Sequence, residues 1–162
     1  MNFSTIVNHD RIANGKKRDV PEDLAEKLRL HSLWLDENPF GRCAFIRRRN
    51  LSDCLLENAR LQGIEAEHCS FAGAIMKGAW LTSADLDFAD LQVCDLRRAN
   101  LIDASLYKAN LRYANLSGAC LRGADLTGAD LRDVNLENAD LRKANLNDAL
   151  LGGIIVDRRT VF

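Results

Sequence analysis

The sequence has no surplus of charge of either sign and no long apolar run. Its 162 residues include 22 Lys and Arg against 23 Asp and Glu. A protein that binds nucleic acid through phosphates needs a basic surplus, so we expect no direct nucleic-acid binding. No stretch is apolar enough to span a membrane, and residues 1–10 lack the apolar segment of a secretory signal. We therefore expect a cytoplasmic protein that does not contact membranes.

The residue types and motifs that perform catalysis are also scarce. The chain contains three His, no Gly-rich phosphate loop and no CxxC pair. These absences give little support to an enzyme or to a bound cofactor. We therefore expect a protein that is not an enzyme and that carries no cofactor.

A five-residue period dominates most of the chain. Fifteen leucines follow one another at intervals of five residues from Leu81 to Leu151, and each has an apolar residue or Cys two places before it. Extended in both directions, the frame covers 23 units from Ile46 to Val156, with departures at Arg49 and Ala66. A fixed short period of this length is typical of a solenoid.

Neither a helix nor a single strand suits this period. A step of five residues turns a helical side chain by about 140°, so no helix face would collect the leucines. In a strand, residues five apart point to opposite sides. The period fits a chain that runs extended for three residues, with the small residue and the Leu inward, and then turns in two residues. Successive coils of such a chain pair as parallel strands about 4.8 Å apart.

The units resemble those of a known family. Residues 84–88 read Ala-Asp-Leu-Asp-Phe, residues 109–113 read Ala-Asn-Leu-Arg-Tyr and residues 124–128 read Ala-Asp-Leu-Thr-Gly. They are similar to the A-(D/N)-L-x-x unit of pentapeptide repeat proteins, although Ser105 and Cys120 depart at the middle position. The resemblance implies an all-β solenoid, a right-handed quadrilateral parallel β-helix with four units per coil. We assign residues 44–158 to this β-helix, which gives just under six coils.

The residues before the repeats divide into two parts. Residues 1–20 form a polar tail, and residues 21–43 predict an amphipathic helix of about four turns with a capping segment. The helix has Pro21 at its start, and its apolar face combines Leu24, Leu28, His31 and Leu35. The first coil of a solenoid exposes an apolar cross-section that must be covered. We expect the helix to cover it, with Trp34 and Phe40 packed on the first coil.

Several early units depart from the pattern without breaking it. Arg49 takes an inward small position, whereas Ile64 and Ala66 exchange the large and small places, which roughly conserves volume. The run of arginines at residues 47–49 is expected to be an ordinary surface feature. Three cysteines replace the small inward residue and are expected to fill the core; they are Cys54, Cys69 and Cys94.

One short segment gathers residue types that bind metals. It contains Glu65, Glu67, His68 and Cys69. In the repeat frame Cys69 points inward, and the two glutamates flank Ala66 on different outward rows. We therefore expect a solvated face and no metal site.

Residues twenty apart should stack on the outer surface, and this brings apolar outward residues together. The candidate interaction residues are Phe88, Val93, Tyr107 and Tyr113, at positions where other units have Gly, Ser, Thr or charge. We interpret them either as side chains that stack along a β-ladder or as a partner-binding surface without charged neighbours. Stacking also places Arg112 over Arg132 and Arg122 over Arg142. These arginines are either offset by nearby aspartates or available to an anionic partner.

The repeats stop at Val156, and residues 159–162 form a cap or a dimer contact. The candidate residues at this end are Leu150, Ile155, Val161 and Phe162. Either the last residues fold back over the final coil, or two copies of the chain meet end to end in a homodimer.

The function expected from these features is that of a non-enzymatic, bacterial scaffold or protein-interaction module whose protein partner is unknown. The alternative that the resemblance implies is a nucleic-acid mimic that modulates DNA gyrase or a related topoisomerase. The gyrase-binding relatives combine a strongly acidic surface with a C-terminal dimerising helix. Residues 44–158 instead carry 16 acidic and 14 basic residues, a net charge of −2, with no insertion between units.

Overall fold

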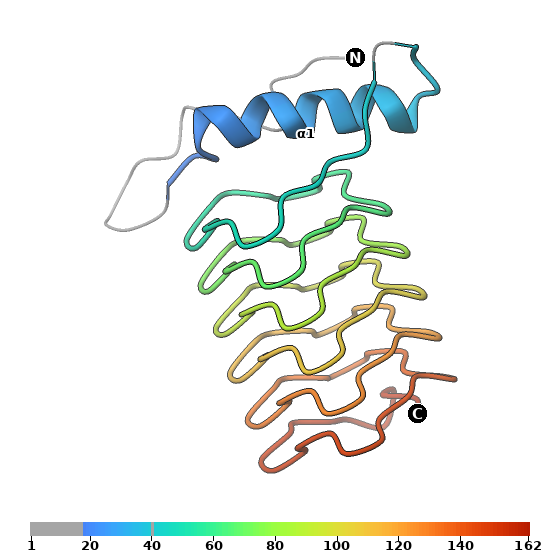
Figure 1. Cartoon of the computed structure of the whole chain (residues 1–162). Coiled ribbons are helices and arrows are strands. Elements are labelled where there is room, and N and C mark those ends of the chain that lie inside the picture. The colour runs from blue at the N-terminus through green and yellow to red at the C-terminus, as the bar shows by residue number, and fades with distance from the viewer. Residues whose placement is uncertain (1–17, 40) are drawn as a thin grey trace.

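A helix lies across one end of a stack of coils (Figure 1). The computed structural model describes residues 18–39 and 41–162, so the tail up to residue 17 and Phe40 lie outside the described residues. Helix α1 spans Glu22–Leu35. The described coils contain isolated parallel bridges, most of which join residues twenty apart, such as Asp85 with Ser105. Twenty residues make four units, so the predicted right-handed quadrilateral β-helix with four units per coil is confirmed.

Every backbone amide of a regular unit has a partner, as the unit at residues 85–89 shows. Asp85 donates to a carbonyl of the preceding coil, at 2.9 Å, and Leu86 and Phe88 donate to carbonyls of the following coil, at 2.8 and 2.9 Å. Ala89 closes the turn by donating to the carbonyl of Leu86, at 3.0 Å. The remaining amide, that of Asp87, donates to the side-chain oxygen Oδ1 of Asp85, at 3.1 Å. This last bond explains why Asp or Asn recurs at the middle position.

The second turn residue of each unit adopts a left-handed backbone conformation. Its φ is +66° at Gly78, +57° at Val93 and +53° at Asp103. A positive φ at the third residue of a four-residue turn is the mark of a type II turn, which Gly and Asn enter at the lowest cost. Bulky residues at this position therefore lie in a conformation that their own side chains disfavour.

The inward rows form one continuous core. The repeat leucines from Leu81 to Leu136 are fully buried, and the buried core also includes Ile64 and Ala66 in their exchanged places. Cys54, Cys69 and Cys94 are buried at the small position, as predicted. Burying one Leu side chain contributes about 1.5–3 kcal/mol, so the stability of the rod is spread along its length.

Helix α1 covers the first coil with the face that the sequence predicts. Leu24, Leu28 and His31 are buried, and Pro21 is the residue before the first turn. The amide of Ala44 donates to Nδ1 of His31, at 3.1 Å. The chain then returns very close to the helix at Gly41, where an added Cβ would lie 2.1 Å from the backbone nitrogen of Trp34. Only Gly permits this approach, which carries the chain from the helix into the first coil.

Two arginines at the capped end take part in the cap. Arg18 bridges to Cys54, donating its amide to the carbonyl of Asp53 at 3.0 Å. Arg49 was predicted to point inward, and this prediction is wrong. Its side chain leaves the core and pairs with Asp23 of α1. No coil of the described residues lies above the first one, so the side chain can turn toward the helix.

The C-terminal residues continue the coil. Val161 bridges to Asp140, one residue later than the spacing of twenty would place it. The extra residue lies in a turn where Oδ1 of Asp157 accepts the amides of Arg159 and Thr160, at 3.1 and 2.9 Å. Val161 therefore pairs along the edge of the preceding coil and does not fold across the end of the rod.

Candidate functional site

The predicted apolar residues lie on the outer surface near the middle of the rod, and we call Phe88, Val93, Tyr107 and Tyr113 the aromatic patch. The rings of Phe88 and Tyr107 meet edge to face, with centroids 5.5 Å apart and planes at 87°. The ring of His68 stacks on Phe88, with centroids 4.7 Å apart and planes at 6°. Sequence reasoning missed this role of His68, although His68 precedes Phe88 by the twenty residues of one coil.

The three most exposed members of the aromatic patch all occupy left-handed turn positions. Phe88, Val93 and Tyr113 are 43%, 62% and 53% exposed, with φ of +57°, +57° and +60°. Val is the least suited of the three, because a β-branched side chain at positive φ is a genuine conformational outlier. Tyr107, at the first turn position, is half-buried.

Cations lie against both tyrosines of the aromatic patch. The ammonium of Lys108 is 5.1 Å from the ring centroid of Tyr107. The guanidinium of Arg112 is 5.0 Å from the ring centroid of Tyr113 and donates to its hydroxyl, at 3.1 Å. The expectation of a surface without charged neighbours is therefore wrong, because the two turn residues of one unit lie side by side. Phe88, Val93 and Tyr113 remain exposed to a partner, which would meet apolar side chains beside two positive charges.

Two further exposed aromatic residues were missed by sequence reasoning. Phe45 and Trp80 are exposed at the middle position of their units. The sequence did contain a signal for them, because each is a large apolar residue at the middle position, where Asp or Asn is usual. Their neighbours twenty residues on are Glu65 and Asn100, so neither extends the aromatic patch.

Two of the four stacked arginines, Arg132 and Arg142, are held by aspartates of their own units, as is Arg97. Arg97, Arg132 and Arg142 each donate through Nε and Nη2 to the aspartate two residues before them, at 2.6–2.9 Å. The hydrogen bond from Arg142 holds the pKa of Asp140 at about 2. Nearby aspartates thus offset Arg132 and Arg142, one of the two predicted possibilities. Arg122 differs, because the residue two places before it is Cys120.

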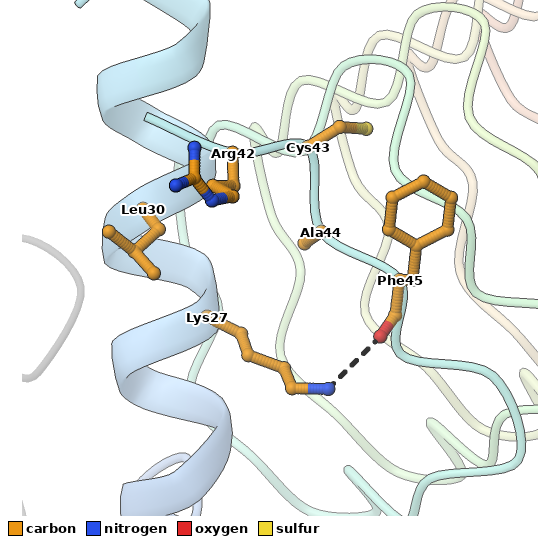
Figure 2. A pocket seen from close by; sticks show the side chains of 6 residues that line it. All are labelled: Lys27, Leu30, Arg42, Cys43, Ala44 and Phe45. Carbon is orange, nitrogen blue, oxygen red and sulfur yellow. Dashed lines mark hydrogen bonds between the residues drawn. The ribbon is translucent and has the colours of Figure 1, made fainter. Parts of the chain in front are cut away.

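A small recess lies between α1 and the first coil (Figure 2). Its volume is about 190 Å³, and its lining residues are Lys27, Leu30, Arg42, Cys43, Ala44 and Phe45. Lys27 donates to the backbone carbonyl of Phe45, at 3.3 Å (Figure 2). Burial and the neighbouring Glu65 raise the pKa of the Cys43 thiol, which keeps it protonated and a poor nucleophile. The recess therefore contributes no group suited to covalent catalysis.

The segment of metal-ligand types does not assemble a site. Glu65 and Glu67 both pair with Arg47, at 2.7 and 3.1 Å, while Cys69 is buried and donates to a backbone carbonyl. His68 stacks on Phe88 instead. Among the residues that the structure describes, no three side chains of ligand type are placed to hold a metal ion.

The candidate residues at the far end of the rod are exposed apolar side chains. The set comprises Leu150, Ile155, Val161 and Phe162. The neighbouring inward residues Leu151 and Val156 are also exposed, because no coil of the described chain follows them.

The geometry defines the chain as a β-helix of five-residue units, and a comparison with known families gives the same result. The family of pentapeptide repeats matches residues 50–87, 89–128 and 119–155, in eight copies. These ranges include well over half of the chain, which therefore belongs to the pentapeptide repeat family. Proteins of this family are generally structural or interaction modules. In the described chain, α1 is too short and too polar to cross a bilayer.

Several solved structures are similar to the chain. The pentapeptide repeat protein Rfr23 from the cyanobacterium Cyanothece 51142 is 27% identical over 74% of this chain and 85% of its own, with a TM-score of 0.46. HetL from the cyanobacterium Nostoc sp. strain PCC 7120, a protein involved in heterocyst differentiation regulation, is 32% identical over 71% of this chain and 58% of its own, with a TM-score of 0.47. QnrB1, a plasmid-mediated fluoroquinolone resistance protein, is 19% identical over 72% of this chain and 92% of its own, with a TM-score of 0.25. No protein of curated function matches the sequence.

Proposed function

We propose that the chain is a non-enzymatic protein-interaction module whose partner binds the aromatic patch. The observation that carries this proposal is Val93, which combines 62% exposure with a φ of +57°. A residue in such a conformation costs about 1–3 kcal/mol, and an exposed apolar side chain recovers little of that by burial. The conformation of Val93 therefore lowers the stability of the free protein. Burial of the Val93 side chain by a partner would be favourable.

Stacking along the ladder accounts for only part of the aromatic patch. Contacts with His68 and Tyr107 stabilise the ring of Phe88, and Arg112 lies against Tyr113. Aromatic pairs of this kind contribute about 0.5–1.5 kcal/mol. Val93 has no ring with which to form such a contact. A partner surface with an apolar centre and carboxylates at its rim would match the patch, because Lys108 and Arg112 lie beside the rings.

The decisive variant is Val93→Asn, because Asn enters the left-handed region readily. We expect its melting temperature to equal or slightly exceed that of the natural protein, whereas affinity capture from the source organism loses the specific partner. Ser83→Asn is the matched control, since Ser83 occupies the same turn position at φ +54° outside the patch. The proposal would be refuted if Val93→Asn still captured the partner, or if Ser83→Asn lost it to the same extent. The aromatic patch would then be explained by side-chain stacking along the ladder alone.

A nucleic-acid mimic that acts on DNA gyrase is the alternative function that the resemblance raised. Such a mimic must present rows of uncompensated negative charge in place of phosphates. Here Arg97, Arg132 and Arg142 neutralise the aspartates beside them. We therefore expect that the added protein leaves supercoiling by purified gyrase unchanged, with and without a quinolone. Inhibition of supercoiling or protection from the drug would favour the mimic over the interaction module proposed here.

We also propose an end-to-end homodimer through the exposed apolar residues of the far end. The support is the cluster of exposed side chains that includes Ile155 and Phe162, which an isologous contact would bury. Light scattering on a sizing column should give about 36 kDa, twice the 18.1 kDa of one chain. Phe162→Asp should halve this mass without unfolding the rod. A mass near 18 kDa for the natural protein at micromolar concentration would refute the dimer.

A further inference from the structure

A second surface recess lies on the side of the rod formed by the units that include Ile102, Arg122 and Arg142. Its volume is about 370 Å³, and its lining residues are Ile102, Asp103, Arg122, Gly123, Arg142 and Lys143. We call it the cationic recess. These residues occupy the two turn positions of three successive coils, twenty residues apart, so their backbones follow one another at the strand spacing of about 4.8 Å.

The charge of the cationic recess is not cancelled in the way it is elsewhere on the rod. Arg122 and Lys143 have no ion-pair partner within 4.0 Å in the part of the chain that the structure describes. The reason is the residue two places before Arg122. In the units of Arg97, Arg132 and Arg142 this residue is an aspartate that pairs with the arginine, whereas before Arg122 it is Cys120. The departure from the repeat at Cys120 thus leaves the guanidinium of Arg122 without an aspartate in its own unit.

The remaining lining residues give the cationic recess a shape and a defined charge. Asp140 fixes Nε and Nη2 of Arg142, at 2.9 and 2.7 Å, which leaves Nη1 for another acceptor. Gly123 has φ +68° and no side chain, and the carboxylate of Asp103 lies over it, with Oδ1 2.2 Å from the position that an added Cβ would take. Together with Asp140, the lining carries three cations and two carboxylates, and Arg122 and Lys143 are its two cations without an ion-pair partner among the described residues.

We propose that the cationic recess binds a phosphate monoester, whose two negative charges would be met by these two cations, Arg122 and Lys143. Arginines bind phosphate oxygens through paired, charge-assisted hydrogen bonds, and Lys adds a point charge. Asp103 would accept a hydrogen bond from a hydroxyl group elsewhere in the ester. The backbone is not available for binding, because the amide of Gly123 already donates to the carbonyl of Arg142, at 3.1 Å. Recognition therefore rests on the side chains of Arg122, Arg142 and Lys143.

The ester has two possible sources, a small phosphorylated metabolite or a phosphorylated side chain of a protein partner. The full chain can be titrated with inorganic phosphate, glycerol phosphate and a phosphoserine peptide to separate these sources. Binding is followed by changes in the amide chemical shifts. Shifts at Gly123 and Lys143 with all three probes support the proposal, and the tightest probe identifies the source. Shifts centred on residues 47–49, or equal binding of single-stranded DNA, would overturn it as non-specific attraction of anions.

Two pairs of variants make the test independent of folding. Arg122→Gln with Lys143→Gln should weaken phosphate binding about tenfold or more, whereas Arg97→Gln on another face should leave it unchanged. Gly123→Ala should weaken binding, because the added Cβ would lie 2.2 Å from Oδ1 of Asp103 and would displace this carboxylate within the recess. Gly118→Ala introduces the same positive-φ strain, yet its Cβ would meet no atom closer than 3.5 Å. Binding that is unchanged in Gly123→Ala, or that falls equally in Gly118→Ala, would overturn the proposal.

Discussion

The two ends of the rod hold the same kind of residue in different surroundings. At the N-terminal end, α1 lies over the first coil, and Leu51 is 0% exposed. At the other end, Leu151 occupies the same place in the five-residue frame and is 37% exposed. The repeat therefore fixes the direction of a side chain, while the neighbouring layers decide how much that side chain stabilises the fold. Substitutions along one inward row can measure this difference.

The largest effect is expected at the middle of the rod. Leu116 is fully buried between coils on both sides, so Leu116→Ala should lower the free energy of unfolding by about 2–5 kcal/mol. Asp130→Ala removes an outward carboxylate that accepts the amide of Arg132 and its guanidinium, and should cost about 1 kcal/mol. Urea denaturation followed by circular dichroism measures both. Equal losses would contradict the inward and outward assignment of these two positions.

A somewhat smaller loss is expected at the cap. Leu28 of α1 is 3% exposed, and Leu28→Ala should cost about 2 kcal/mol, because the helix can detach before the coils unfold. Hydrogen exchange distinguishes detachment of the helix from unfolding of the whole rod. The amide of Leu55, which donates to the carbonyl of Arg18 at 3.1 Å, should exchange faster than in the natural protein. The amide of Leu116 should keep its protection, and a parallel loss at both would show that the cap and the coils unfold as one unit.

Mild acid should weaken the capped end alone. Burial lowers the pKa of His31 below its ordinary value of 6.5, and the backbone of Gln62 opposes this in part. Between the folded and unfolded pKa values only the unfolded chain binds the proton, so stability falls as pH drops below about 6.5, by up to about 1.4 kcal/mol per pH unit. The paired aspartates have pKa values below 3.8 and lose their contribution only in stronger acid.

Trp34 can report this acid effect, since its ring lies 5.5 Å from that of His31. In a Trp80→Phe background, Trp34 fluorescence should show a lower urea midpoint at pH 5.5 than at pH 7.5. His31→Gln, which does not titrate, should remove the difference. A midpoint that stays pH-dependent in His31→Gln would assign the effect to another group.

Much of the fold could be predicted from the sequence because the inward positions repeat, and much of the site could not because the outward side chains do not. The burial of Leu86 or Ala89 follows from the frame alone. The place of Arg49 depended on its pairing with Asp23 of α1, and the stack of His68 on Phe88 depended on side-chain orientations that no local pattern encodes. Lys108 and Arg112 lie against the rings of Tyr107 and Tyr113 for the same reason.

The smallest effect is expected at the exposed end. Leu151→Ala should cost less than about 1 kcal/mol in the monomer, because the side chain already contacts water and its loss creates no closed cavity. Leu51→Ala, at the same place in the frame beneath α1, should cost several times more. The proposed dimer adds a condition, since a contact that buries Leu151 would make its substitution more costly as protein concentration rises. Melting curves of both variants at several concentrations therefore test the comparison of the two ends. A large, concentration-independent loss in Leu151→Ala would show that this end is as well covered as the other.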